Sequence, residues 1–77
     1  PASVDDEKLF FRTVRAAFAQ RRKTLSNALR SAFSELDRAA IESAMEETGL
    51  PPAVRGETLS IAQFAALSNA LLRKFDK

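Results

Sequence analysis

Residues 36–52 read LDRAAIESAMEETGLPP and carry the clearest helical pattern in the chain. Apolar residues recur here at helical spacing, and either Ser34 or Asp37 can cap the first turn. Gly49 supplies a left-handed cap, and the pair Pro51–Pro52 stops the helix. The stretch therefore predicts a helix that starts near residue 37 and ends before a loop.

Two more helices are predicted before this stretch. Residues 5–19 repeat apolar side chains at helical spacing, and Ser3 or Asp5 can start this helix with acids in its first turn. Thr24 can cap the next helix. Residues 20–23 fit either a turn between the two helices or a continuous helix, and the sequence leaves both open.

One further helix is predicted after the loop at residues 50–59. Ser60 followed by Gln63 has the spacing of a capping box, in front of an apolar stripe that extends from Ile61 to Phe75. Alternating Val, Ile and Thr runs typical of strands are absent from the sequence. The expected fold class is all-α, a small bundle of about four helices.

Helical spacing also predicts which side chains form the core. On the first helix, Phe10, Phe11, Val14, Ala17 and Phe18 form one stripe, with Phe11 nearest the charged side. The expected core comprises Phe10, Val14, Phe18, Leu29, Phe33, Ile41, Met45, Phe64, Leu67 and Leu71, with Phe75 also packed inside.

Length and composition restrict the class of protein. A chain of 77 residues without Cys has no disulfide and must depend on apolar packing. No stretch reaches the roughly 20 apolar residues of a membrane span. We expect one monomeric domain in the cytoplasm, with residues 1–4 as a linker and the whole as a piece of a longer protein.

Catalytic chemistry has little support in the sequence. The chain has no His and no Cys, which removes the commonest general base and the usual transition-metal ligands. Gly49 and Gly56 are isolated, so no glycine-rich phosphate loop is present. The acids Glu42, Glu46 and Glu47 are typical of a solvated helix face. We expect no catalytic residue, cofactor site or metal site in these residues.

The charge distribution is more informative than the net charge of +2. Residues 8–30 contain seven Lys or Arg and no acid, whereas residues 31–57 contain six acids and two Arg. The basic half has the electrostatic pattern of a surface that binds RNA phosphates, although an ordinary solvated surface also fits. Helical spacing puts Lys8, Arg12 and Arg15 on one side of the first helix. The candidate RNA-binding residues are Lys8, Arg12, Arg15, Gln20, Arg21, Arg22, Lys23, Asn27 and Arg30.

Two runs carry a resemblance to a known family. Residues 11–29, FRTVRAAFAQRRKTLSNAL, and residues 55–64, RGETLSIAQF, occur in this order. Both runs resemble the C-terminal helical domain of the ribosomal RNA small-subunit adenine dimethyltransferases. With residues 65–71 they cover about half of the chain.

The resemblance implies a parent enzyme that uses S-adenosylmethionine to dimethylate two adjacent adenosines of small-subunit rRNA during ribosome assembly. It implies that catalysis and cofactor binding belong to an N-terminal domain, whose glycine-rich loop and Asn-Leu-Pro-Tyr-like motif have no match here. The implied partners are small-subunit rRNA, the 30S precursor and that catalytic domain. The fragment alone is then not an enzyme.

Two roles remain open for the basic residues. By their place in the matching run, Arg21, Arg22 and Lys23 are the first candidates for RNA contacts. Alternatively, Arg21 or Arg22 pairs with the acidic third helix or with the catalytic domain, and the chain is a protein-interaction module that docks that domain or a ribosomal protein. Arg55 and Glu57 are expected to form a local ion pair.

Overall fold

The computed structural model describes residues 6–19, 22–51 and 53–75. The order of elements is α1 (Glu7–Ala19), α2 (Leu25–Ala32), α3 (Arg38–Glu47), the 3₁₀ helix η1 (Gly56–Thr58) and α4 (Ile61–Phe75). The described residues contain no strand. The predicted all-α bundle of four helices is confirmed.

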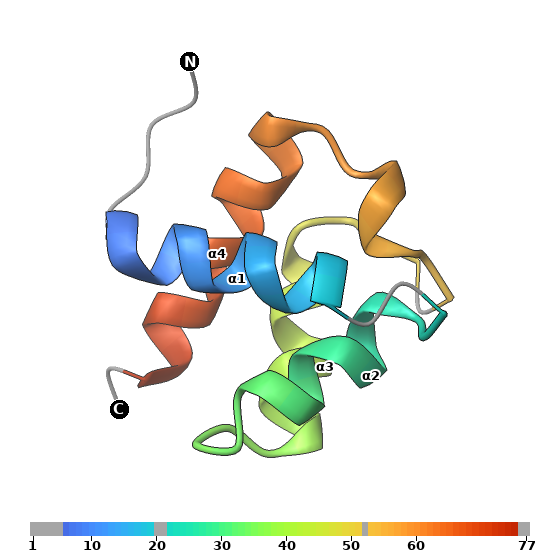
Figure 1. The fold of residues 1–77 in the computed structure, drawn as a ribbon. Helices are drawn as coiled ribbons and strands as arrows, with labels where there is room; N and C mark the ends of the chain where they lie inside the picture. The colour runs from blue at the N-terminus through green and yellow to red at the C-terminus, as the bar shows by residue number, and fades with distance from the viewer. Residues whose placement is uncertain (1–5, 20–21, 52, 76–77) are drawn as a thin grey trace.

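Each of the four helices packs against two others, in the cyclic order α1, α2, α3, α4. α1 lies across α4 and also contacts α2 and η1, while α3 packs against both α2 and α4 (Figure 1). Figure 1 shows α2 and α3 side by side at one end of the molecule, connected by the short turn at residues 33–37. This arrangement places α1 and α2, which carry the basic residues, next to each other.

The helix ends are set by short-range caps. Asp37 accepts a hydrogen bond from the Ala40 amide at 2.8 Å, and Gly49 has the left-handed φ of 71° that ends α3. Thr24 caps α2 through the Asn27 amide. These predicted boundaries are confirmed. Of the two residues proposed to cap α3, Asp37 forms the cap and Ser34 does not.

The capping box of α4 is also confirmed. The Gln63 amide donates to Ser60 Oγ at 3.2 Å, and the Ser60 amide donates to Gln63 Oε1 at 2.8 Å. At the other end of the chain, Ser3 and Asp5 lie outside the described residues, and Asp6 accepts a hydrogen bond from the Leu9 amide at the start of α1.

Seven of the predicted core residues lie fully inside, and the core is centred where α2, α3 and α4 meet. Phe33, Leu29, Ile41, Met45, Phe64, Leu67 and Leu71 are buried. Phe10 and Val14 are only partly buried against them. The buried centre therefore agrees with the helical periodicity for three of the four helices.

The prediction for α1 was wrong in its rotation. Its buried side consists of Leu9, Thr13, Ala16 and Ala17, whereas Phe18 is 42% exposed. Small side chains allow α1 to approach its neighbours closely, and the Thr13 hydroxyl is satisfied by the Leu9 carbonyl at 2.8 Å. The bulky rings are consequently displaced to the flanks of the helix.

The predicted stripe of α4 was wrong at both of its ends. Ile61 is 66% exposed and Phe75 is 38% exposed, because the first and last turns of α4 extend beyond the packed centre. Phe75 still contacts the edge of the core, with its ring centroid 6.1 Å from that of Phe33. Phe18 similarly rests against Phe64 at 6.0 Å.

Gly56 allows η1 to contact α1, and its replacement by alanine is expected to destabilise the fold. An added Cβ would lie 2.5 Å from Ala17 Cβ and 3.2 Å from Ala17 Cα. Overpacking of this kind costs about 1–3 kcal/mol, measurable by urea unfolding. The second substitution Ala17→Gly should recover part of the loss, and additive effects of the two would contradict the contact.

Candidate nucleic-acid interface

The first basic cluster is a groove between α1 and the end of α2, which we call the α1 groove. Lys8, Arg12 and Arg15 share one side of α1, as predicted from their spacing. The structure adds an aromatic ring, Phe11, to the same side. The α1 groove has a volume of about 570 Å³ and is lined by Lys8, Phe11, Arg12, Arg15, Ala16, Ala19 and Ala32.

Arg12 differs from its two basic neighbours because it is already bound within the fold. Its Nη2 donates to the Ala32 carbonyl at 2.8 Å and to Glu35 Oε1 at 2.7 Å, and its guanidinium lies 4.3 Å from the centroid of the Phe33 ring. The hydrogen bond from Arg12 lowers the pKa of the Glu35 carboxyl. Arg12 therefore ties α1 to α2, and its charge is balanced.

The second basic cluster lies along α2, and we call it the α2 hollow. Lys23 precedes the helix, and together with Asn27, Arg30 and Ser31 of α2 it lines a hollow of about 410 Å³. Two cations and an amide in this arrangement can contact phosphate and sugar oxygens. The structure thus brings together three of the predicted site residues.

The connection between α1 and α2 contains the remaining predicted residues. Gln20 and Arg21 lie outside the described residues. Arg22 is exposed, and its carbonyl accepts a hydrogen bond from Arg55 Nη1 at 3.1 Å. This contact links the loop before α4 to the start of α2, and the expected pair of Arg55 with Glu57 stays a prediction. The side chain of Arg22 forms no ion pair with any acid in the described ranges.

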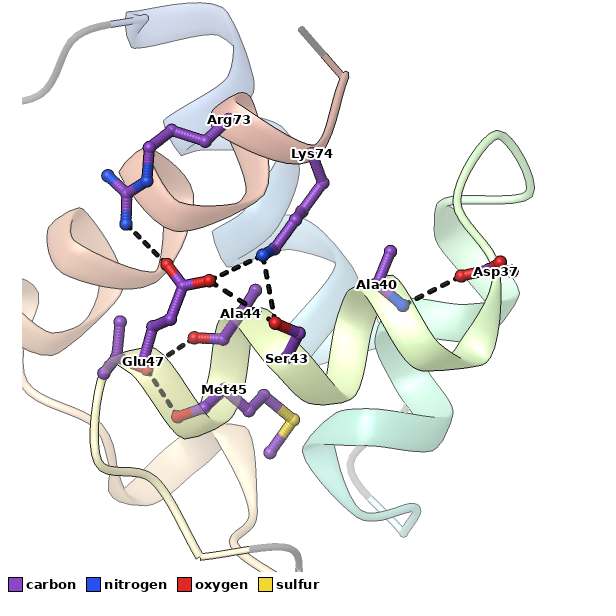
Figure 2. Close-up of polar contacts among 9 residues, drawn as sticks. Asp37, Ala40, Ser43, Ala44, Met45, Glu47, Arg73 and Lys74 are labelled. Atoms are coloured by element: carbon purple, nitrogen blue, oxygen red, sulfur yellow. Dashed lines mark hydrogen bonds and ion pairs between the residues drawn. The ribbon is translucent and has the colours of Figure 1, made fainter. Parts of the chain in front are cut away.

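Two of the acidic residues of α3, Glu42 and Glu47, are paired with cations outside the basic half. Figure 2 shows Glu47 between Arg73 and Lys74 of α4, at 2.8 Å and 2.5 Å, with Lys74 also bonded to Ser43. Arg38 pairs with Glu42 one turn along α3 at 2.8 Å. Ion pairs therefore join α3 to α4 and link two turns within α3. Sequence analysis did not predict the pairs with α4, because Glu47 and Lys74 are far apart in the chain.

The pairs at Glu47 predict a loss of stability in acid. Hydrogen bonds from Lys74 and then Arg73 lower the pKa of Glu47 to about 2 from 4.5. Because the folded state has the lower pKa, this stabilisation is present above about pH 4.5 and is lost as the pH falls towards about 2. Urea unfolding across this range should show a smaller acid sensitivity for Glu47→Gln than for wild type. An equal change in Glu46→Gln, an exposed neighbour, would argue against this assignment.

A further hollow lies beside α3 and does not fit S-adenosylmethionine. It has a volume of about 290 Å³ and is lined by Ser26, Glu42, Met45, Glu46 and Leu50. It offers no aromatic ring for an adenine and no cation for the carboxylate of the amino acid. Within the described ranges there is also no group of acids that could hold a metal ion and no helix long and apolar enough to cross a membrane.

Comparison with known proteins identifies close relatives. The chain is 49% identical to the ribosomal RNA small subunit methyltransferase A of Geobacillus thermodenitrificans over 77 residues, which is 97% of this chain and 26% of that protein. The corresponding protein of Bacillus cytotoxicus is 54% identical over 71 residues, 90% of this chain and 24% of that protein. That of Lactococcus lactis is 45% identical over 69 residues, with the same coverage of 90% and 24%.

No family model matches the chain. The chain spans about a quarter of the length of the curated relatives that it matches. The alignment nevertheless extends over nearly all of the chain and so covers both runs that carried the resemblance. Over nearly its whole length the chain is therefore homologous to a segment, about a quarter, of the ribosomal RNA small subunit methyltransferase A proteins.

Proposed function

We propose that the chain is the rRNA-binding accessory domain of a 16S rRNA adenine dimethyltransferase, which modifies two adjacent adenosines during small-subunit assembly in the cytoplasm. In this proposal residues 1–77 form a single, monomeric C-terminal domain that binds the 30S precursor. The catalytic domain and its S-adenosylmethionine belong to the rest of a longer protein. The names and lengths of the relatives support this division.

The observation that carries the proposal is the separation of paired from unpaired cations. The cations that form ion pairs in the described part of the chain are Arg12, Arg38, Arg73 and Lys74. The other cations of α1, α2 and the turn between them are exposed and form no ion pair with an acid in the described part of the chain. They are Lys8, Arg15, Arg22, Lys23 and Arg30. Unpaired cations on adjacent helices can release counterions from RNA phosphates on binding.

The RNA-binding role is tested by titration with a small-subunit rRNA fragment. Neutralising the α2 hollow with Lys23→Gln and Arg30→Gln should weaken binding. The matched control, Arg38→Gln with Arg73→Gln, removes the same charge from paired positions and should bind as wild type. Equal weakening in both variants would show that only net charge matters.

The accessory role predicts that this chain neither binds S-adenosylmethionine nor transfers a methyl group, because the glycine-rich loop and the Asn-Leu-Pro-Tyr-like motif of the catalytic domain have no match in its sequence. Isothermal calorimetry with the cofactor should give no heat of binding. Micromolar affinity would place the active site within these 77 residues and overturn the assignment of an accessory role.

A second candidate function is docking of the catalytic domain or a ribosomal protein. Two exposed apolar side chains, Phe18 and Ile61, favour it. Phe18 rests on Phe64, and Ile61 lies one turn before Phe64 on α4. Exposed side chains of this kind are typical of protein contacts. The substitution Ile61→Ser should then weaken docking of a separately produced catalytic domain and leave RNA titrations unchanged.

A further inference from the structure

We propose that the α1 groove binds one unpaired RNA nucleotide, with its base stacked on the Phe11 ring and the phosphates on its two sides held by Lys8 and Arg15. This inference rests on the proposed RNA-binding function and specifies the form of RNA recognised. It also divides the basic surface into two sites, the α1 groove for an unpaired base and the α2 hollow for the RNA backbone.

Phe11 is placed as a stacking platform rather than as a core residue. Its side chain is 57% exposed, although Leu9 and Thr13, two residues before and after it on α1, are buried. The ring contacts Phe10 edge-on, with centroids 5.4 Å apart and planes at 70°, which restricts its orientation. An exposed ring held in this way loses little freedom when a base stacks on it.

The groove around Phe11 has room for a base. Apart from Phe11, its apolar lining consists of the small side chains Ala16, Ala19 and Ala32, which leave the volume of about 570 Å³ beside the ring. Arg12 forms a fixed part of the wall because Glu35 and the Ala32 carbonyl hold it. The space is therefore shaped by the fold before any ligand binds.

The charges that flank the ring suit a phosphate on each side of the base. Lys8 precedes Phe11 by three residues and Arg15 follows it by four, so all three lie on one side of α1. Lys8 and Arg15 are exposed and have no ion-pair partner among the described acids. Glu35, the acid that contacts the groove residue Arg12, is already paired with it.

The aromatic ring decides between unpaired and paired RNA. A duplex presents phosphates and sugars but keeps its base faces stacked inside, whereas an unpaired nucleotide can place its base on an aromatic side chain. The α2 hollow has cations and Asn27 but no aromatic residue in its lining. The α1 groove is thus suited to a loop or bulge nucleotide, and the α2 hollow to the backbone.

The test compares Phe11→Leu with Phe18→Leu, which makes the same change in an exposed ring outside the groove. The probes are a single-stranded RNA of about eight nucleotides and a duplex containing the same strand. Loss of one stacked base should weaken binding of Phe11→Leu to the single strand by roughly 5- to 150-fold and leave its duplex affinity unchanged. Phe11→Tyr should retain binding, and Phe18→Leu should bind both probes as wild type.

A second measurement uses the wild-type chain, so that the result does not depend on the folding of a variant. Stacking should move the Phe11 ring proton resonances upfield when the single strand is added, and not when the duplex is added. Two results would overturn the stacking site: an unchanged affinity of Phe11→Leu for the single strand, or an equal loss of affinity for both probes. An unchanged affinity would leave a protein as the occupant of the groove. Failure of wild type to bind either RNA would instead reject the proposed function itself.

Discussion

Replacing Phe33 by alanine is expected to lower the free energy of unfolding by about 3–5 kcal/mol. Phe33 is fully buried at the end of α2, and its ring contacts both the guanidinium of Arg12 and the ring of Phe75. Its removal leaves a cavity where α1, α2 and α4 meet. Small domains of this size have a total stability of roughly 3–5 kcal/mol, so most of the chain should be unfolded.

Circular dichroism during thermal and urea unfolding measures this loss. The matched control is Phe18→Ala, which removes the same ring from a half-exposed position and should cost clearly less. Similar losses in the two variants would mean that the centre of the core has been placed wrongly.

The helix boundaries could be predicted because they depend on neighbours in sequence. Asp37 reaches the Ala40 amide and Ser60 reaches Gln63, each three residues away, and Gly49 adopts its φ through its own lack of a side chain. Such contacts need no knowledge of the tertiary fold.

The rotation of α1 could not be predicted in the same way. Periodicity alone favoured the side with Phe10, Val14 and Phe18, because large apolar residues are normally buried. Of the predicted stripe the structure fully buries only Ala17, which it joins with Leu9, Thr13 and Ala16, since close packing against η1 requires a small residue facing Gly56. That requirement arises from a segment some forty residues later in the chain.

The candidate site shows the same division between local and distant contacts. Helical spacing placed Lys8, Arg12 and Arg15 on one side of α1, as the structure does, whereas the hollow that Lys23, Asn27 and Arg30 line together comes from the structure alone. It could not show that Glu35 neutralises Arg12, because that pair forms only when α1 and α2 pack together. A signal was available, however, since Glu35 is the first acid after the basic segment.

RNA binding by this chain is expected to fall steeply with salt. If about three of the unpaired cations each contact one phosphate, the log-log slope of affinity against salt is roughly −2 to −3. This slope corresponds to about a 20- to 60-fold loss of affinity between 50 and 200 mM salt. The cause is entropic, because each contact releases condensed counterions from the RNA.

The most direct measurement is this slope in wild type and in the two charge variants, with helicity checked by circular dichroism. Lys23→Gln with Arg30→Gln and Arg38→Gln with Arg73→Gln both change the net charge from +2 to 0, since +2 − 2 = 0. Removal of two phosphate contacts should bring the slope of the first variant to about −1 or shallower, and that of the second should stay at the wild-type value. A folded first variant with the wild-type slope, or a wild-type chain whose binding does not respond to salt, would contradict the account.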